Sequence, residues 1–303
     1  MIISSVLTIS CSEKKEQIYT LFHGGTILIV DETFSEVEAM VIKDPKIVAT
    51  GSFEELNNEY GQSAKLIDLE GRIMLPGFID AHSHAVSGAL VNNLMDYVGM
   101  SRYKNTEEVL NHFEQKVLET PEGEWITGRN WDPAVQDGPE ELTITMLDSI
   151  STKHPIFIIN ASGHLAYANS KAFEAAGIDS NVKNPPGAEF VRDANGNLNG
   201  VMKNMLSFIQ VMQANPKMQS YEPVPALLEL LNEWSTVGVT TSSELALGTA
   251  TNSTADLDIM LEAANNEAFS VRLRAYPQYG LNDQWTESGL KNNIGNDLAK
   301  VVG

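Results

Sequence analysis

The sequence predicts an α/β protein in which a small β module precedes a long run of alternating strands and helices. Residues 20–75 contain short β-rich segments separated by turns. From residue 76 onward, apolar runs typical of buried strands alternate with segments whose apolar residues recur at helical spacing. This alternation is typical of parallel βα units. The 303 residues suffice for one large core or two moderate ones.

The β module is predicted from five short strands. The segments 39–42 and 47–49 flank the turn Lys43-Asp44-Pro45-Lys46, which is typical of a hairpin. The other strands are expected at 26–30, 65–69 and 71–74.

The second part of the chain carries the βα pattern. Strands are expected at 125–127, 155–159, 237–241 and 270–275. Helices are expected from Asn105, which can cap the segment leading to Val117, and at 224–237 and 257–264. Residues 181–222 are interrupted by Pro, Gly and Asn, and they are predicted to form a long loop excursion.

The charge of the chain excludes one class of partner. Forty acidic residues against 20 Lys and Arg give a net charge of −20. A nucleic-acid partner would require a basic face that displaces phosphate counterions, so none is expected. The single cysteine, Cys11, excludes an internal disulfide.

Residues 1–19 are interpreted as a leader and linker. A short uncharged apolar run ends at Ser10, and a polar stretch follows Cys11. This order resembles the end of a bacterial lipoprotein signal, which implies export to the periplasm or cell envelope and a lipid anchor on Cys11. No Lys or Arg precedes the run, and Thr8 is a departure from the signal. The alternative is a cytoplasmic protein with a frayed N-terminus and a free thiol. No other segment approaches the ~20 apolar residues of a membrane-spanning helix.

The most informative motif is Phe78-Ile-Asp-Ala-His-Ser-His84. Side chains alternate along a strand, so His82 and His84 are expected to point the same way and to bind one cation. The preceding apolar run 73–79 places the pair where a buried strand meets a loop, which is the catalytic face of a parallel barrel. Without further context, a His-x-His pair can also consist of two polar residues on the protein surface that bind no metal.

The context of this pair resembles a known family. The string from Leu75 to His84, after a β module that ends in Gly71-Arg72, resembles the start of the amidohydrolase barrel. Within that superfamily the chain is similar to the amidohydrolase-3, or YtcJ-like, branch from about residue 20 to 303. Further matching strings lie at 125–132, 147–148, 154–156, 162–164, 168–170, 176–178 and 192–193.

The resemblance implies a (β/α)8 TIM-type barrel beside a small β-sandwich. Residues 20–75 would be part of the sandwich, and 76–303 would be a barrel truncated before its last strands, with about five strands present. The resemblance also implies one or two divalent ions, usually zinc, that activate water against an amide-like C–N bond of a small molecule. His82 and His84 would be metal ligands. Further ligands would follow strands four to eight: an acidic or carboxylated side chain, two more histidines, and a late aspartate that would lie beyond residue 303. The general acid or base is also expected beyond residue 303, and the oligomeric state is open.

Three more residues are substrate-pocket candidates, each with a structural alternative. His164 would reach the active-site mouth, or bond to loop backbone. Trp131 and Asp132 would line the pocket, or serve as a core residue and a helix cap. The other histidines, at positions 23, 112 and 154, are interpreted as structural.

Two positions depart from the branch. Asn204 stands where a glutamate is expected, which would weaken a second metal site, and Glu244 stands where relatives tend to show aspartate. Two other interpretations therefore stay open beside an active hydrolase. They are a catalytically silent, lipid-anchored binding homologue and an inactive gene fragment.

Overall fold

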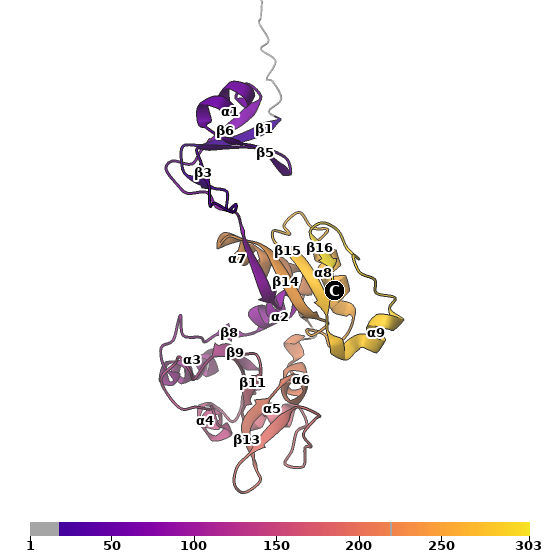
Figure 1. Cartoon of the computed structure of the whole chain (residues 1–303). Helices are drawn as coiled ribbons and strands as arrows, with labels where there is room; N and C mark the ends of the chain where they lie inside the picture. The colour runs from indigo at the N-terminus through magenta and orange to yellow at the C-terminus, as the bar shows by residue number, and fades with distance from the viewer. Residues whose placement is uncertain (1–17, 219) are drawn as a thin grey trace, which may run out of the picture. The chain divides into compact units, whose positions relative to one another are not determined.

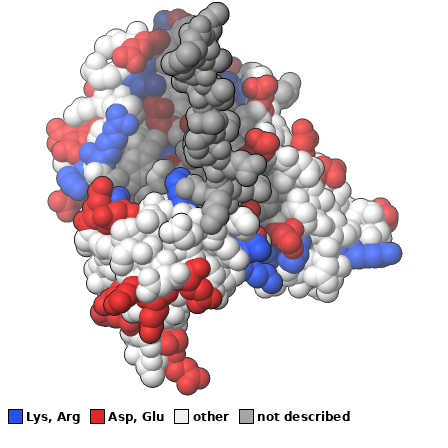
Figure 2. Space-filling view, turned by 90° about the horizontal axis from the view of Figure 1, so that it is seen from above, with Lys and Arg blue, Asp and Glu red and all other residues white. Residues whose placement is uncertain are grey.

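The computed structural model describes residues 18–218 and 220–303, which fall into two compact units (Figure 1). The first unit ends at Phe78 and the second comprises Ile79–Gly303. Cys11 and the predicted leader lie outside the described residues. No helix within the described ranges is long and apolar enough to cross a membrane. Figure 2 shows acidic side chains in several groups, with Lys and Arg side chains scattered between them.

The first unit is built on a four-stranded sheet with the order β5-β4-β1-β6. β1 runs parallel to β6 and antiparallel to β4. The predicted hairpin is confirmed as the antiparallel pair β4–β5, with a cis peptide bond between Asp44 and Pro45 in its turn. The buried core of the unit consists of Leu21, Ala39, Val41, Leu56 and Ala64. The elements are β1 (Tyr19–His23), β2 (Ile27–Leu28), β3 (Glu36–Val37), β4 (Ala39–Lys43), β5 (Lys46–Gly51), α1 (Phe53–Tyr60) and β6 (Ala64–Asp68).

Two features of this unit differ from the prediction. Residues 53–60 form helix α1 where strands and turns were predicted. Ser52 caps this helix: its hydroxyl accepts the Glu55 N–H at 3.3 Å and donates to the Glu55 carboxylate at 3.0 Å. The strand expected at 71–74 is reduced to a single bridge between Met74 and Ile27.

The second unit contains two separate sheets. One has the order β16-β15-β14-β7, with parallel pairing of β14 to β15 and of β15 to β16. Its strands are β7 (Phe78–Ser83), β14 (Val239–Leu247), β15 (Arg272–Pro277) and β16 (Ala299–Val301). The other sheet has the order β12-β13-β11-β10-β9-β8. Its strands are β8 (Asp96–Tyr97), β9 (Ile126–Trp131), β10 (Ile156–Asn160), β11 (Leu165–Ala168), β12 (Glu189–Arg192) and β13 (Leu198–Lys203).

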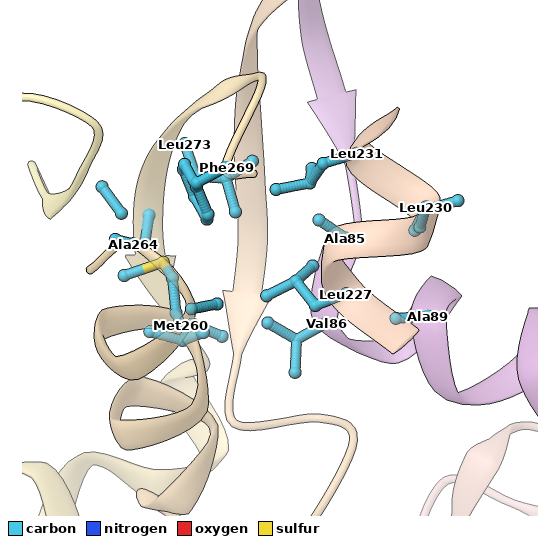
Figure 3. Close-up of a cluster of buried hydrophobic side chains, with 14 of the residues drawn as sticks. Ala85, Val86, Ala89, Leu227, Leu230, Leu231, Met260, Ala264, Phe269 and Leu273 are labelled. Carbon is cyan, nitrogen blue, oxygen red and sulfur yellow. The ribbon is translucent and has the colours of Figure 1, made fainter. Parts of the chain in front are cut away.

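The six-stranded sheet is an insertion between two consecutive strands of the four-stranded sheet. The chain leaves the four-stranded sheet after β7 and α2 (Ala85–Leu94). It returns to this sheet through α7 (Pro223–Thr236), which leads into β14. Ala85, Val86 and Ala89 of α2 share a buried cluster with Leu227 and other residues of α7 (Figure 3). This packing brings the two ends of the insertion together. Its own helices are α3 (Thr106–Glu119), α4 (Ile144–Ile150), α5 (Ser170–Ala175), α6 (Met205–Gln213) and η1 (Pro216–Met218).

The four-stranded sheet has its own helices beyond α7. They are α8 (Ala255–Ala263), η2 (Tyr279–Leu281) and α9 (Asn282–Glu287). Met260 of α8 and Leu273 of β15 belong to the same buried cluster as α2 and α7, so this part of the unit has one continuous core.

The α/β class is confirmed, but the described strands do not form a closed barrel. The strand expected at 155–159 is β10, and it lies in the inserted sheet. Its five residues are all buried, and such a run fits either sheet. The loop excursion expected at 181–222 is wrong, because this segment contains β12, β13 and α6. Its Asn and Gly residues mark the tight turn at Asp193, whose carboxylate accepts the N–H groups of Asn195 and Asn197.

A candidate metal site at the start of helix α2

The structure brings His82 and His84 together. His82 lies on β7 and His84 is the N-cap residue of α2, and both side chains are exposed. Their ring centroids are 5.3 Å apart and the ring planes are nearly perpendicular, at 87°. The preceding strand was expected to be buried, yet Phe78 and Ile79 are 58% and 73% exposed, because β7 is the edge strand of its sheet.

Strand β14 holds the segment that carries these histidines. The Ser83 hydroxyl lies 2.7 Å from that of Ser242 and donates to the Ser243 carbonyl at 3.1 Å. The Nδ1 atom of His84 lies 2.7 Å from the Leu245 carbonyl oxygen. A carbonyl only accepts, so Nδ1 carries the proton and Nε2 keeps the lone pair with which a neutral imidazole binds metal.

Glu244, noted in the sequence only as a departure from the branch, was not predicted to belong to this site. Its side chain is 1% exposed, and its Oε2 accepts the backbone N–H groups of Ala85 and of Val86, the latter at 3.3 Å. Burial raises the pKa of the Glu244 carboxyl to about 8, while the hydrogen bonds from Ala85 and Val86 act in the opposite direction. The strand was predicted only at 237–241, whereas β14 extends to Leu247, and a buried acidic residue on a strand requires a partner.

The two histidines fit a divalent metal ion as part of a ligand set. Two adjacent imidazoles, one with its tautomer fixed by a backbone carbonyl, are the donors that zinc prefers. Within residues 18–218 and 220–303, no group of three or more His, Cys, Asp or Glu side chains is close enough to hold a metal. The described part of the chain therefore offers two adjacent imidazoles and no complete metal site.

The structure places Trp131 in the core of the inserted sheet. Its side chain has no exposed surface, its ring meets Tyr167 edge to face at 5.0 Å, and its indole N–H donates to the Thr106 hydroxyl at 3.2 Å. A side chain without exposed surface can reach no ligand in this structure. Asp132 is half-buried, and its carboxylate accepts the Ala134 N–H at 2.9 Å in the following turn. Trp131 therefore lies in the core, as its structural alternative describes, whereas Asp132 caps a turn and not a helix.

His164 lies in the turn between β10 and β11 and is exposed. Its carbonyl accepts the Asn204 N–H at 2.6 Å, and its own N–H donates to the Ser162 hydroxyl at 3.2 Å. His164 and His82 are thus carried by different sheets, and the use of His164 in a substrate pocket stays a prediction.

The other three histidines have structural contacts. His154 is 4% exposed and lies 2.9 Å from the Ser151 hydroxyl. His112 pairs with Asp96 at 3.0 Å, and His23 stacks on the ring of Phe53.

The side chain of Asn204 is bonded to the loop that contains Gly187. Its side-chain amide donates to the Gly187 carbonyl at 2.7 Å, and its backbone has a φ of +66° and a ψ of 150°. This strained conformation disfavours most side chains. The glutamate of the branch could not donate to Gly187, because a carboxylate is an acceptor.

Replacing Asn204 by glutamate is expected to lower the free energy of unfolding by about 0.5–1.5 kcal/mol, because the exposed hydrogen bond to the Gly187 carbonyl is lost. Urea unfolding would measure the change. Asn204→Asp is the matched control, since it removes the donor and keeps the size. If both variants unfold at the wild-type urea concentration, the loop does not depend on this bond.

The comparisons with known proteins identify the family. A sequence profile of the amidohydrolase family matches residues 65–301. The chain therefore belongs to the amidohydrolase family, and the resemblance drawn from its motifs is confirmed.

Two relatives and one solved structure illustrate the similarity. YtcJ of Bacillus subtilis (strain 168) is 28% identical over 221 residues, which cover 73% of this chain and 41% of YtcJ. The N-substituted formamide deformylase of Arthrobacter pascens is 28% identical over 59% of this chain and 33% of its own length. The crystal structure of an uncharacterized metal-dependent hydrolase from Pyrococcus horikoshii OT3 aligns with a TM-score of 0.60 and 21% identity, over 94% of this chain and 54% of that one. The last similarity concerns the fold alone, and the chain spans only about half or less of each of these proteins.

Proposed function

We propose that the protein is a metal-dependent hydrolase that acts on amide-like carbon–nitrogen bonds of small molecules. The observation that carries this proposal is the His82–His84 pair, in which the Leu245 carbonyl fixes the ring of His84 with Nε2 available as a ligand. Membership in the amidohydrolase family supports the reaction class.

The residues of this chain would contribute ligation and orientation. His82 and His84 would hold a divalent ion, with zinc the best match to two imidazole donors. Such an ion lowers the pKa of bound water and polarises a carbonyl group. The hydrogen bonds of Ser83 and His84 to β14 keep the segment between the two ligands in one conformation. No described residue is assigned as the general acid or base.

The proposed substrate class is small N-acyl or N-formyl compounds. The Arthrobacter relative is named for the deformylation of N-substituted formamides, which is hydrolysis of a C–N bond. The net charge of −20 supports a small molecule rather than a nucleic acid as the partner.

Metal analysis combined with a hydrolysis assay tests the proposal. The purified protein is expected to retain zinc and to release formate or another acid from a panel of N-substituted formamides and N-acyl amines. His84→Ala is expected to lose the metal and at least ~10³-fold of the rate, because removing a ligand removes the activated water. Ligand binding without retained metal would instead support the silent homologue, and aggregation with neither property would support the fragment.

The lipid anchor on Cys11 and the export of the protein stay predictions. Cell fractionation of the wild type and of Cys11→Ala would test them, since only the wild type is expected in the membrane fraction.

A further inference from the structure

We propose that Glu244 is the positioning residue for His84, holding this histidine in the orientation that a metal ligand needs. The inference rests on the proposed function, because His84 acts as a ligand only if the protein holds a metal. Glu244 lies on β14, and its side chain is 1% exposed. Its carboxyl group accepts the N–H groups of Ala85 and Val86, the first two residues of α2.

The start of α2 is capped from another strand instead of by its own N-cap residue. The first N–H groups of a helix have no partner within the helix, and the side chain of the N-cap residue usually accepts them. His84 occupies the N-cap position of α2 but makes no side-chain capping bond. Its ring bonds to the Leu245 carbonyl instead. Because Glu244 takes over the capping, the ring of His84 remains available for a ligand.

Neighbouring residues of β14 thus bond to the residue before His84, to its ring, and to the two residues after it. Ser242 and Ser243 hold Ser83 before the histidine, Leu245 holds the ring, and Glu244 holds the two residues that follow. A metal ligand has to be held within about 0.5 Å of its productive position by such supporting contacts. Loss of an outer partner of a ligand typically lowers metal affinity by about 10- to 100-fold.

The test is the affinity of the full chain for Zn²⁺, measured by competition with a chelator of known affinity. Glu244→Leu keeps the bulk of the side chain but has no acceptor, and it is expected to weaken Zn²⁺ binding by about 10- to 100-fold. Glu244→Gln keeps an acceptor oxygen and is expected to stay within about threefold of the wild type. Replacing Zn²⁺ by Co²⁺ adds a spectroscopic readout, because a displaced His84 would alter the visible absorption bands of bound Co²⁺.

Asp256→Asn is the matched control. Asp256 is also 1% exposed, and it accepts the N–H groups of Gly248, Ala250 and Thr251 in the loop after β14. The variant changes a buried carboxyl group that accepts backbone N–H groups of the loop after β14 and none of those of α2. It is expected to lower stability and to leave Zn²⁺ affinity unchanged.

The outcomes separate this inference from the proposed function. If the wild type binds no Zn²⁺, the proposed function fails. If His84→Ala loses Zn²⁺ while Glu244→Leu keeps wild-type affinity, the proposed function stands and Glu244 is not a positioning residue. If Glu244→Leu does not fold, the inference is tested instead by amide hydrogen exchange of Ala85 and Val86 in the wild type. Slow exchange of both is expected, and exchange at the rate of an unprotected amide would overturn the inference.

Discussion

Replacing Trp131 by alanine is expected to lower the free energy of unfolding by about 3–5 kcal/mol, the range for removing a buried aromatic side chain from a core. The ring has no exposed surface, contacts Tyr167 edge to face and donates its N–H to Thr106. Urea unfolding followed by circular dichroism would measure the loss.

The same variant separates the two interpretations of Trp131. A residue that lines a substrate pocket can be truncated with little loss of stability, whereas a core residue cannot. Trp131→Phe is the control, because it keeps an aromatic ring against Tyr167 and loses only the bond to Thr106, at a cost of about 1–2 kcal/mol. Wild-type stability of the alanine variant would return Trp131 to the pocket candidates.

Raising the pH from about 5 to about 8 is expected to destabilise the metal-free wild type by an amount on the order of a few kcal/mol through Glu244. Burial raises the pKa of this carboxyl group from its ordinary value of 4.5 to about 8. Between these values the unfolded chain has lost the proton while the folded chain keeps it. The unfolded state thus binds fewer protons, and the free energy of unfolding falls as the pH rises through this window.

Urea unfolding at several pH values in the presence of EDTA would test this expectation. Glu244→Gln cannot ionise, so its free energy of unfolding should depend less on pH than that of the wild type. The stability contributed by the neutral carboxyl group is fully present below about pH 4.5 and lost by about pH 8. Parallel pH profiles for the two proteins would show that Glu244 titrates normally in the folded state.

Local patterns predicted the parts of the molecule that local interactions determine. The spacing of His82 and His84 predicted that both would lie on one strand, whereas only His82 lies on β7 and His84 is the N-cap residue of α2. Their rings are nevertheless 5.3 Å apart. The Ser52-x-x-Glu55 pattern marks the start of α1, but residues 20–75 were predicted as strands and turns alone. The burial of β10 was predicted, whereas its assignment to one of two sheets was not, because the same apolar run suits both.

Contacts between segments far apart in the chain leave no comparable pattern in the amino-acid sequence. The Leu245 carbonyl that orients His84 is a backbone group present at every position, so no residue type marks it. The capping of α2 by Glu244 joins residues 158 and 159 positions apart. For Trp131 a pocket and a core demand the same aromatic residue, and only the tertiary structure distinguishes them.

The insertion between β7 and β14 also sets an order of events on the ribosome. His84 is synthesised about 160 residues before the Leu245 carbonyl that orients it, because the whole inserted sheet is translated in between. At ~5–20 residues per second this interval lasts roughly 8–32 s. During that time the two imidazoles belong to a nascent chain without their supporting strand. The orientation of the His84 ring by the Leu245 carbonyl is therefore acquired late, only after β14 has emerged and paired.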